Sequence, residues 1–141
     1  MILNILYRLK LVLLALLVPL ICLQGYSQAE LNIEITGLRS NDGVISFELF
    51  NASEQIVSKF EKSIEDKKCL IVFKELACEF YAIRYFHDEN ANKELDKNWL
   101  GMPTEGYGFS NDAYGFFGPK EFKEWLFELQ GDTTIVMKTQ Y

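Results

Sequence analysis

Residues 31–50, LNIEITGLRSNDGVISFELF, hold the pattern that decides the fold. In residues 31–36 every second side chain is apolar, which is the period of a strand with one buried face. Residues 44–50 repeat the alternation, and the continuous apolar set that we expect to face the core is Ile45, Phe47 and Leu49. Between the two runs, residues 40–43 read Ser-Asn-Asp-Gly, a strong turn signal. We therefore expect two strands joined as a hairpin.

Three further runs outside this stretch are typical of strands. They are Cys69–Phe73, Phe80–Phe86, which we expect to be a central strand, and Thr133–Thr139, which we expect to close the sheet. Short strands separated by turns, with no alternation of strand and helix, indicate an all-β protein. The predicted fold is an antiparallel β-sandwich of about seven strands, immunoglobulin-like or transthyretin-like.

Two segments leave their secondary structure open. Residues 51–66 space Ile56, Phe60 and Ile64 as one face of a short helix or as the anchors of a loop. Residues 121–129 fit a short helix, although Leu126–Leu129 also fits a strand.

The N-terminal segment predicts export. Residues 1–29 combine a basic start at Arg8 and Lys10 with an apolar run and small residues suited to cleavage after Ser27 or Ala29. We therefore expect a signal peptide over 1–29, one domain over 30–141, and a periplasmic or extracellular location without a membrane span in the mature chain. An uncleaved anchor, or lipidation at Cys22, is the less favoured alternative.

Charge and cysteine content restrict the partners and the redox chemistry. Without the leader, 12 basic residues stand against 20 acidic ones, which disfavours nucleic acid and anionic membranes as partners. The expected partner is an unidentified envelope or extracellular molecule. Cys69 and Cys78 would form a disulfide by default in an oxidising compartment. Their expected separation along two strands instead favours two buried thiols.

Residues 87–119 run without a convincing strand or helix, and so long a loop is usually functional or packed upon itself. Oxygen-bearing side chains occupy relative positions 1, 3, 5 and 9 of its first part: Asp88, Asn90, Asn92 and Asp96. This spacing occurs in calcium loops, where the backbone carbonyl of the seventh residue, here Glu94, adds a ligand. The alternative is a solvated turn in which these side chains cap their own backbone.

Two positions count against calcium. Lys93 stands where such loops usually have glycine, because the backbone there needs a positive φ. Trp99 stands where an EF-hand has its bidentate glutamate, so the segment is not an EF-hand.

No catalytic set can be assembled from the sequence. His87 is the only histidine, so neither a serine nor a cysteine triad nor a zinc cluster can be completed without it. A lone histidine at the end of a strand is more often a hydrogen-bonded structural residue. We predict no enzyme activity and no catalytic residues, with an uncharacterised hydrolase as the less favoured alternative.

The segment Glu105–Pro119 is rich in glycine and in aromatic residues. The aromatic residues that would form a stacking platform for a sugar or a peptide are Tyr107, Phe109, Tyr114, Phe116 and Phe117. Folded back, the same rings would instead cover one end of the sandwich. The second arrangement is favoured, since a small domain gains more free energy from burying five rings than from displaying them.

Residues 86–119 resemble the signature of the bacterial Domain of Unknown Function 2141 family. The matching residues are Phe86, His87, Asp88, Asn90, Asn92, Leu95, Asp96, Asn98, Gly101, Pro103, Glu105, Gly106, Gly108, Phe109, Ser110, Asn111, Phe117, Gly118 and Pro119. The resemblance implies an exported, immunoglobulin-like sandwich and brings no established activity. The chain departs from the pattern at Ala91 and Lys93, where the family tends to have glycine, and at Leu76–Glu79, where it favours a Pro/Gly turn.

These observations favour an exported, non-enzymatic β-sandwich module of unknown function, stabilised by calcium if the loop binds it, in a binding or envelope-accessory role. The alternative is a carbohydrate- or peptide-binding protein that uses the aromatic segment 105–119.

Overall fold

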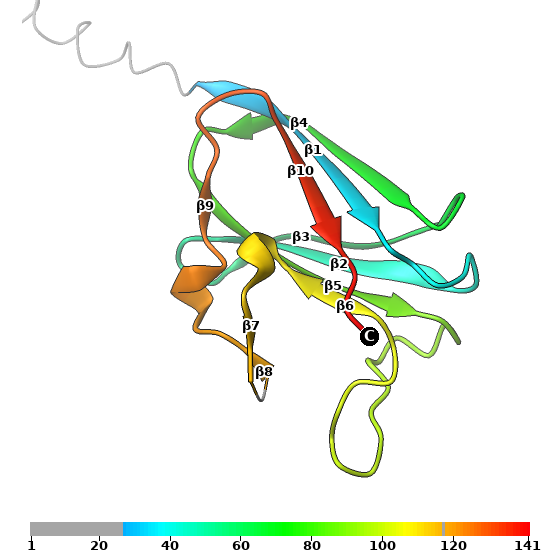
Figure 1. The fold of residues 1–141 in the computed structure, drawn as a ribbon. Helices are drawn as coiled ribbons and strands as arrows, with labels where there is room; N and C mark the ends of the chain where they lie inside the picture. The colour runs from blue at the N-terminus through cyan, green and yellow to red at the C-terminus, as the bar shows by residue number, and fades with distance from the viewer. Residues whose placement is uncertain (1–26, 117) are drawn as a thin grey trace, which may run out of the picture.

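The computed structural model describes residues 27–116 and 118–141 and shows two sheets packed face to face (Figure 1). The three-stranded sheet has the order β10-β1-β4, with strands β1 (Gln28–Thr36), β4 (Cys69–Ala77) and β10 (Thr133–Lys138). The five-stranded sheet has the order β3-β2-β5-β6, with β9 paired to one end of β5. Its strands are β2 (Val44–Asn51), β3 (Ile56–Lys62), β5 (Phe80–Asp88), β6 (Tyr107–Phe109) and β9 (Phe127–Glu128). The predicted all-β sandwich is confirmed.

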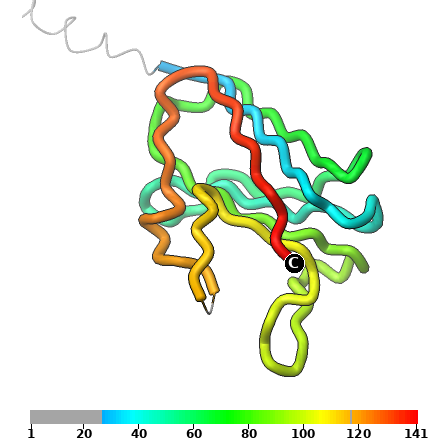
Figure 2. Tube along the Cα trace, viewed as in Figure 1, coloured from blue at the N-terminus to red at the C-terminus, as the bar shows by residue number. Residues whose placement is uncertain are grey.

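The small elements lie between β6 and β9. Strands β7 (Tyr114–Gly115) and β8 (Gly118–Pro119) form a separate two-stranded hairpin. Two short 3₁₀ helices, Ser110–Asp112 and Phe122–Glu124, flank that hairpin. The tube view shows the hairpin and the loop before β6 projecting from the same side of the sandwich (Figure 2).

The core lies between the sheets, and the alternation in β1 and β2 determines which side chains enter it. The inner residues of β2 are fully buried, as predicted: Ile45, Phe47 and Leu49. Leu31, Ile33 and Ile35 meet them from β1. In β1 the polar neighbours of these residues face outward, so that strand has one apolar and one polar face. In β2 the outer face also holds buried residues, Glu48 and Phe50.

The predicted hairpin between β1 and β2 is wrong, because the two strands lie in different sheets. β1 pairs with β4 and with β10, whereas β2 pairs with β3 and β5. The connection, residues 37–43, crosses from one sheet to the other and buries Leu38 in the core. A connection that carries its own buried side chain suits a crossing between layers better than a tight two-residue turn.

Residues 51–66 contain the edge strand β3, whereas their sequence pattern allows a short helix or a loop. The i, i+4 spacing of Ile56 and Phe60 also fits a strand, because four is a multiple of its period of two. Phe60 pairs with Phe47 of β2, and their ring centroids lie 5.2 Å apart.

Of the two alternatives for residues 121–129, the strand is confirmed in part by β9, and the helix is limited to the short 3₁₀ helix Phe122–Glu124. The apolar residues of this segment do not share one face. Phe122, Trp125 and Leu126 pack outside the five-stranded sheet, whereas Leu129 enters the main core.

The predicted signal peptide lies outside the described residues except for residues 27–29. Within the described part of the chain, no helix is long and apolar enough to cross a membrane. Cys69 and Cys78 are both free thiols, which is the arrangement that their predicted separation favours. Burial raises the pKa of the Cys69 thiol to about 11.

Candidate functional site

The connection from β5 to β6, residues 89–106, is called the long loop, and two buried carboxylates brace its base. Asp88 is fully buried, and its oxygens accept hydrogen bonds from the backbone N–H groups of Asn92 (3.0 Å) and Lys93 (2.8 Å). Glu105 is also buried and accepts from the N–H groups of Glu89 (2.8 Å) and Asp96 (3.0 Å). Both carboxylates therefore satisfy backbone donors that no strand pairs.

His87 joins the long loop to two other segments. Its ring is fully buried, and Nε2 lies 2.7 Å from the backbone carbonyl oxygen of Asp42. A carbonyl only accepts hydrogen bonds, so Nε2 carries a hydrogen, and Nδ1 lies 2.9 Å from the hydroxyl oxygen of Tyr141. Arg39 lies over the Tyr141 ring and forms an ion pair with Glu89. Both ring nitrogens of the histidine are thus used structurally.

The glycines of the segment Glu105-Gly-Tyr-Gly-Phe109 allow the chain to pack closely against the core. A Cβ at Gly108 would lie 2.3 Å from the ring of Tyr85, and a Cβ at Gly106 would lie 2.5 Å from Thr139. With no side chain on the inner face of β6, the rings of Tyr107 and Phe109 lie on the outer face of the five-stranded sheet.

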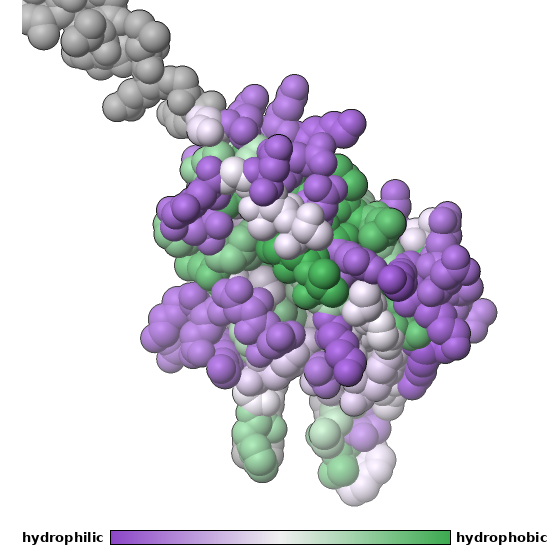
Figure 3. All heavy atoms as spheres, turned by 45° about the horizontal axis from the view of Figure 1, so that its top comes forward, coloured by the Kyte–Doolittle hydropathy of each residue, from purple (hydrophilic) through white to green (hydrophobic). Residues whose placement is uncertain are grey.

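The far end of the long loop, residues 98–103, is called the apolar tip. Asn98 holds it, since its side-chain oxygen accepts from the N–H groups of Leu100 (2.9 Å) and Met102 (3.1 Å). The side chains that this turn presents to solvent are large and apolar: Trp99 is 91% exposed, Leu100 62% and Met102 61%. Figure 3 shows two projections at the lower edge of the molecule with hydrophobic residues near their ends.

Three of the aromatic residues predicted to bind a ligand pack against one another. Tyr107, Phe109 and Tyr114 form a triangle of edge-to-face contacts with ring centroids 5.8–6.0 Å apart. Trp125 and Phe122 complete this aromatic cluster over the outer face of the five-stranded sheet. The rings are folded back, as favoured, but they cover the outer face of a sheet and not one end of the sandwich.

The other two predicted ligand-binding residues lie away from this triangle. Phe116 is 93% exposed at the end of the β7–β8 hairpin, and Phe117 lies outside the described residues. The described aromatic residues therefore form a packed layer and a projecting hairpin, with no flat row of exposed rings.

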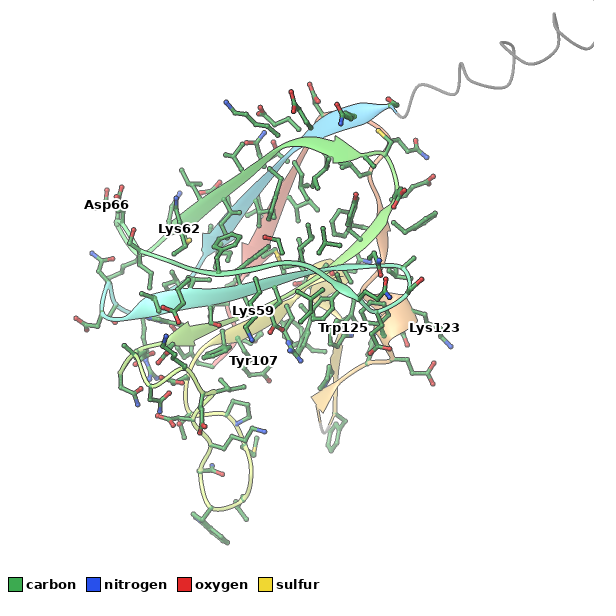
Figure 4. All side chains as sticks on the ribbon, turned by 180° about the vertical axis from the view of Figure 1, so that it is seen from behind. Lys59, Lys62, Asp66, Tyr107, Lys123 and Trp125 are labelled. Carbon is green, nitrogen blue, oxygen red and sulfur yellow. The ribbon has the colours of Figure 1, made fainter. Side chains whose placement is uncertain are left out.

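A groove of about 230 Å³ lies beside the aromatic cluster, on the outer face of the five-stranded sheet. Its lining residues are Ser46, Glu48, Arg84, Tyr85, Phe86, Leu95, Tyr107 and Phe109. Figure 4 shows Lys59, Tyr107 and Trp125 on the side of this sheet that faces away from the three-stranded sheet. β2, β5, β6 and the long loop all contribute to the groove.

Glu48 is a buried carboxylate at this groove, and cations from both neighbouring strands hold it. Lys59 lies 3.0 Å from one oxygen, and Arg84 donates to the other from Nε (2.7 Å) and from Nη2. Burial opposes the ionisation of Glu48, but the hydrogen bonds from Lys59 and Arg84 outweigh it and lower the carboxyl pKa.

The lowered pKa predicts how stability depends on pH. A carboxyl whose folded pKa lies below its unfolded value stabilises the protein above about pH 4.3, and this stabilisation is lost as the pH falls through the folded pKa. We expect the free energy of unfolding of Glu48→Gln to fall less than that of the wild type between about pH 6 and about pH 3. Urea denaturation across this range measures it, and parallel curves for the two proteins would contradict the assignment.

The residues predicted to bind calcium lie together, and N–H donors point at their oxygens. Asp88 binds two backbone N–H groups, and Asp96 accepts from the side-chain amides of Asn90 (2.7 Å) and Asn92 (3.0 Å). The side-chain oxygens of both asparagines accept from backbone N–H groups, one of them that of Glu94. Among the described residues, no group of three or more histidine, cysteine, aspartate or glutamate side chains is placed to hold a metal ion.

The backbone of this turn has the shape that a calcium loop would need. Lys93 has φ +70° and Ala91 has φ +58°, the left-handed region that favours glycine. The two departures from the family pattern therefore stand where the chain is strained. The observed contacts are those of a turn that caps itself.

A melting experiment decides between a calcium site and a turn that only caps itself. We expect the melting temperature in about 10 mM calcium to equal that in EDTA, because a cation would displace several N–H donors and meet only two charged side chains. A rise in melting temperature with calcium that Asp96→Asn abolishes would instead establish the site. Saturation at 100 times Kd would add about 2.7 kcal/mol.

Together these features define a β-sandwich domain, antiparallel except for the parallel pair of β1 and β10, that carries a braced, projecting loop and a shallow groove on one sheet. The chain belongs to the family described as "Uncharacterized protein conserved in bacteria (DUF2141)", whose family model matches residues 33–137, well over half of the chain. The membership that the sequence motif predicts is confirmed. Comparison with curated proteins and with solved structures found no match to the chain.

Sequence reasoning missed the groove and the apolar tip. Glu48 and Arg84 each stand alone as a charge inside an apolar strand, which is a signal for a pair across strands. The loop spacing explains Trp99 only as the residue that stands in place of the EF-hand glutamate, and it says nothing of Leu100 and Met102. A cluster of large apolar residues inside a polar, irregular segment is itself a signal for a contact surface.

Proposed function

We propose that the chain is an exported, non-enzymatic binding module that contacts an envelope or extracellular protein through the apolar tip. The observation that carries the proposal is the exposure of Trp99, Leu100 and Met102 on a loop held by its own hydrogen bonds. Tryptophan and methionine are enriched in protein interfaces, and tryptophan often supplies a large part of the binding energy.

The bracing of the loop supports this role. Burying a large apolar side chain is worth about 1.5–3 kcal/mol, so a partner that covers the three side chains of the tip gains several times that amount. A loop that Asp88, Glu105 and Asn98 already order loses little conformational entropy on binding. The non-enzymatic part is supported by His87, whose two ring nitrogens are both occupied inside the protein.

Export is part of the proposal, and β1 favours one of the two cleavage positions. β1 begins at Gln28, and Ala29 is buried and pairs with Leu76 of β4. Cleavage after Ser27 keeps every residue of β1 and removes only the hydrogen bond from the Cys78 N–H to the Ser27 carbonyl, whereas cleavage after Ala29 also removes the first pairs of the strand. We expect the mature chain to begin at Gln28, and the intact mass of the protein from the periplasm or the medium measures this. A retained leader, or a chain that begins at Glu30, would contradict it.

Site-specific photocrosslinking tests the binding proposal. Benzoylphenylalanine is placed at Trp99 or Met102 in the exported protein, and as a control at Val136 or Leu70, which are exposed on the outer face of the three-stranded sheet. We expect a discrete protein adduct from positions 99 and 102 and none from the controls. Adducts of equal yield from both faces, or none from the tip, would overturn the proposal.

A second variant separates loss of binding from loss of the fold. Trp99→Ser removes an exposed side chain, so its melting temperature should stay that of the wild type. The same substitution should remove the adduct formed from Met102. An unchanged adduct would show that the tip does not hold the partner.

A further inference from the structure

The groove on the outer face of the five-stranded sheet carries a local excess of positive charge in an acidic protein. Lys59, Glu48 and Arg84 stand in one row across β3, β2 and β5, since Glu48 is in register with both cations. The single buried carboxylate neutralises one of the two cations. The row therefore retains one positive charge, whereas the whole chain has a formal net charge of −6.

Arg84 has N–H donors that could bind a second anion beside Glu48. Its Nε and Nη2 atoms point at Glu48, and its side chain is 48% exposed. A guanidinium has five N–H donors, and the donors on Nη1 lie outside this pair. The Phe50 ring lies 5.5 Å beneath the guanidinium and helps to fix its plane.

The walls of the groove are apolar. Phe86, Leu95, Tyr107 and Phe109 line it, and besides the hydroxyl of Tyr107 the neutral polar groups of the lining are those of Ser46 and the buried Tyr85. The volume of about 230 Å³ lies below the roughly 300–1,000 Å³ of most small-molecule sites, so the groove suits one side chain and its carboxylate. A sugar would place many hydroxyl groups against carbon walls and leave them without hydrogen bonds.

We propose that this groove binds a carboxylate attached to an apolar side chain, as at the C-terminus of a peptide or protein. The carboxylate pairs with Arg84, while Lys59 offsets the charge of Glu48 from the neighbouring strand, and the apolar group packs between Leu95 and Tyr107. The inference rests on the proposed binding function and names the chemical group that the partner brings to this face. Recognition of a terminal carboxylate by a guanidinium needs both charge and planar geometry.

Nuclear magnetic resonance titration with small probes tests the proposal on the intact mature protein. The probes are N-acetyl-leucine, its uncharged amide, acetate and glucuronate, and the signals followed are the Arg84 side-chain N–H and the Tyr107 ring. We expect saturable shifts with N-acetyl-leucine and affinity at least about tenfold weaker for the amide and for acetate. Equal binding of the amide would overturn the role of charge. Tighter binding of glucuronate would assign the groove to acidic sugars, and no shift with any probe would overturn the site.

Two variants keep the test independent of folding. Leu95→Glu adds a negative charge to the half-buried wall without touching the Glu48–Arg84 pair, and we expect it to weaken N-acetyl-leucine binding by at least about tenfold. The double variant Glu48→Gln with Arg84→Gln removes the pair without leaving a lone buried charge and should weaken binding similarly. Thr134→Glu, on the outer face of the other sheet, is the matched control and should bind normally. Unchanged affinity in either groove variant would overturn the proposal.

The titration tests the groove and the photocrosslinking tests the apolar tip, so each proposal can be rejected without the other. Crosslinks at the apolar tip with no shift in the groove would leave the binding module and remove the carboxylate site. Shifts in the groove without crosslinks at the tip would leave the carboxylate site and remove the proposal that the tip binds a partner.

Discussion

Gly43→Ala is expected to lower the free energy of unfolding by more than about 4 kcal/mol, which is most of the stability of many small domains. Gly43 has φ +70°, and a Cβ there would lie 1.9 Å from the carbonyl oxygen of Asp88 and 2.7 Å from Cα of Glu89. Both are backbone atoms at the end of β5, where the long loop begins, so no side chain can move to relieve the clash. Urea denaturation followed by circular dichroism measures the loss.

Gly101→Ala is the matched control. Gly101 has φ +80°, so it has a similar backbone conformation, but nothing lies within 4 Å of a Cβ added there. Its substitution should cost only the conformational strain, about 1 kcal/mol. The difference between the two variants therefore measures how tightly the connection before β2 packs against the end of β5. Equal losses would show that strain alone explains the effect.

Glu105→Ala is expected to lower the free energy of unfolding by about 3 kcal/mol, because hydrogen bonds to a charged group contribute about 1.5–3 kcal/mol each and two half-buried N–H donors lose their acceptor. The donors are the N–H groups of Glu89 and Asp96, which lie at the two sides of the base of the long loop. Hydrogen exchange followed by mass spectrometry should show these two amides exchanging faster, while the amides of β2 change less.

Glu94→Ala is the control within the same loop. Glu94 is exposed, so its substitution should change the free energy of unfolding by no more than about 0.5 kcal/mol. Glu105→Gln keeps one acceptor oxygen, so its loss in free energy of unfolding should lie between those of Glu105→Ala and Glu94→Ala. If the Glu89 and Asp96 amides exchanged as slowly in Glu105→Ala as in the wild type, the carboxylate would not brace the loop.

The sequence predicts the faces of the strands but not their partners. The alternation in residues 31–36 and 44–50 indicates which side chains face the core between the sheets, and the structure confirms this. It does not indicate that Glu48 and Phe50 are buried on the outer face of β2. It contains no information about which strand lies beside which, and β1 pairs with β10, more than a hundred residues further along the chain. The sequence does not identify β3 as a strand, because a spacing of four between apolar residues fits both a helix and a strand.

The candidate site shows the same limit. The oxygen-rich turn could be located from sequence because its residues are close together in the chain, and the structure explains them as hydrogen-bond acceptors. The groove could not, because Glu48, Arg84, Leu95 and Tyr107 come from four separate segments. Only the fold brings them together, and the fold depends on pairings that periodicity does not determine.

The parallel pairing of β1 with β10 also constrains when the protein can fold. Glu30, near the start of β1, donates to the side chain of Asp132, and Arg39 donates to the hydroxyl of Tyr141 at the end of the chain. The three-stranded sheet therefore stays incomplete until β10 has been synthesised. A strand that must wait for a partner about a hundred residues further along the chain delays closure of the sandwich, because contacts of such long range form slowly.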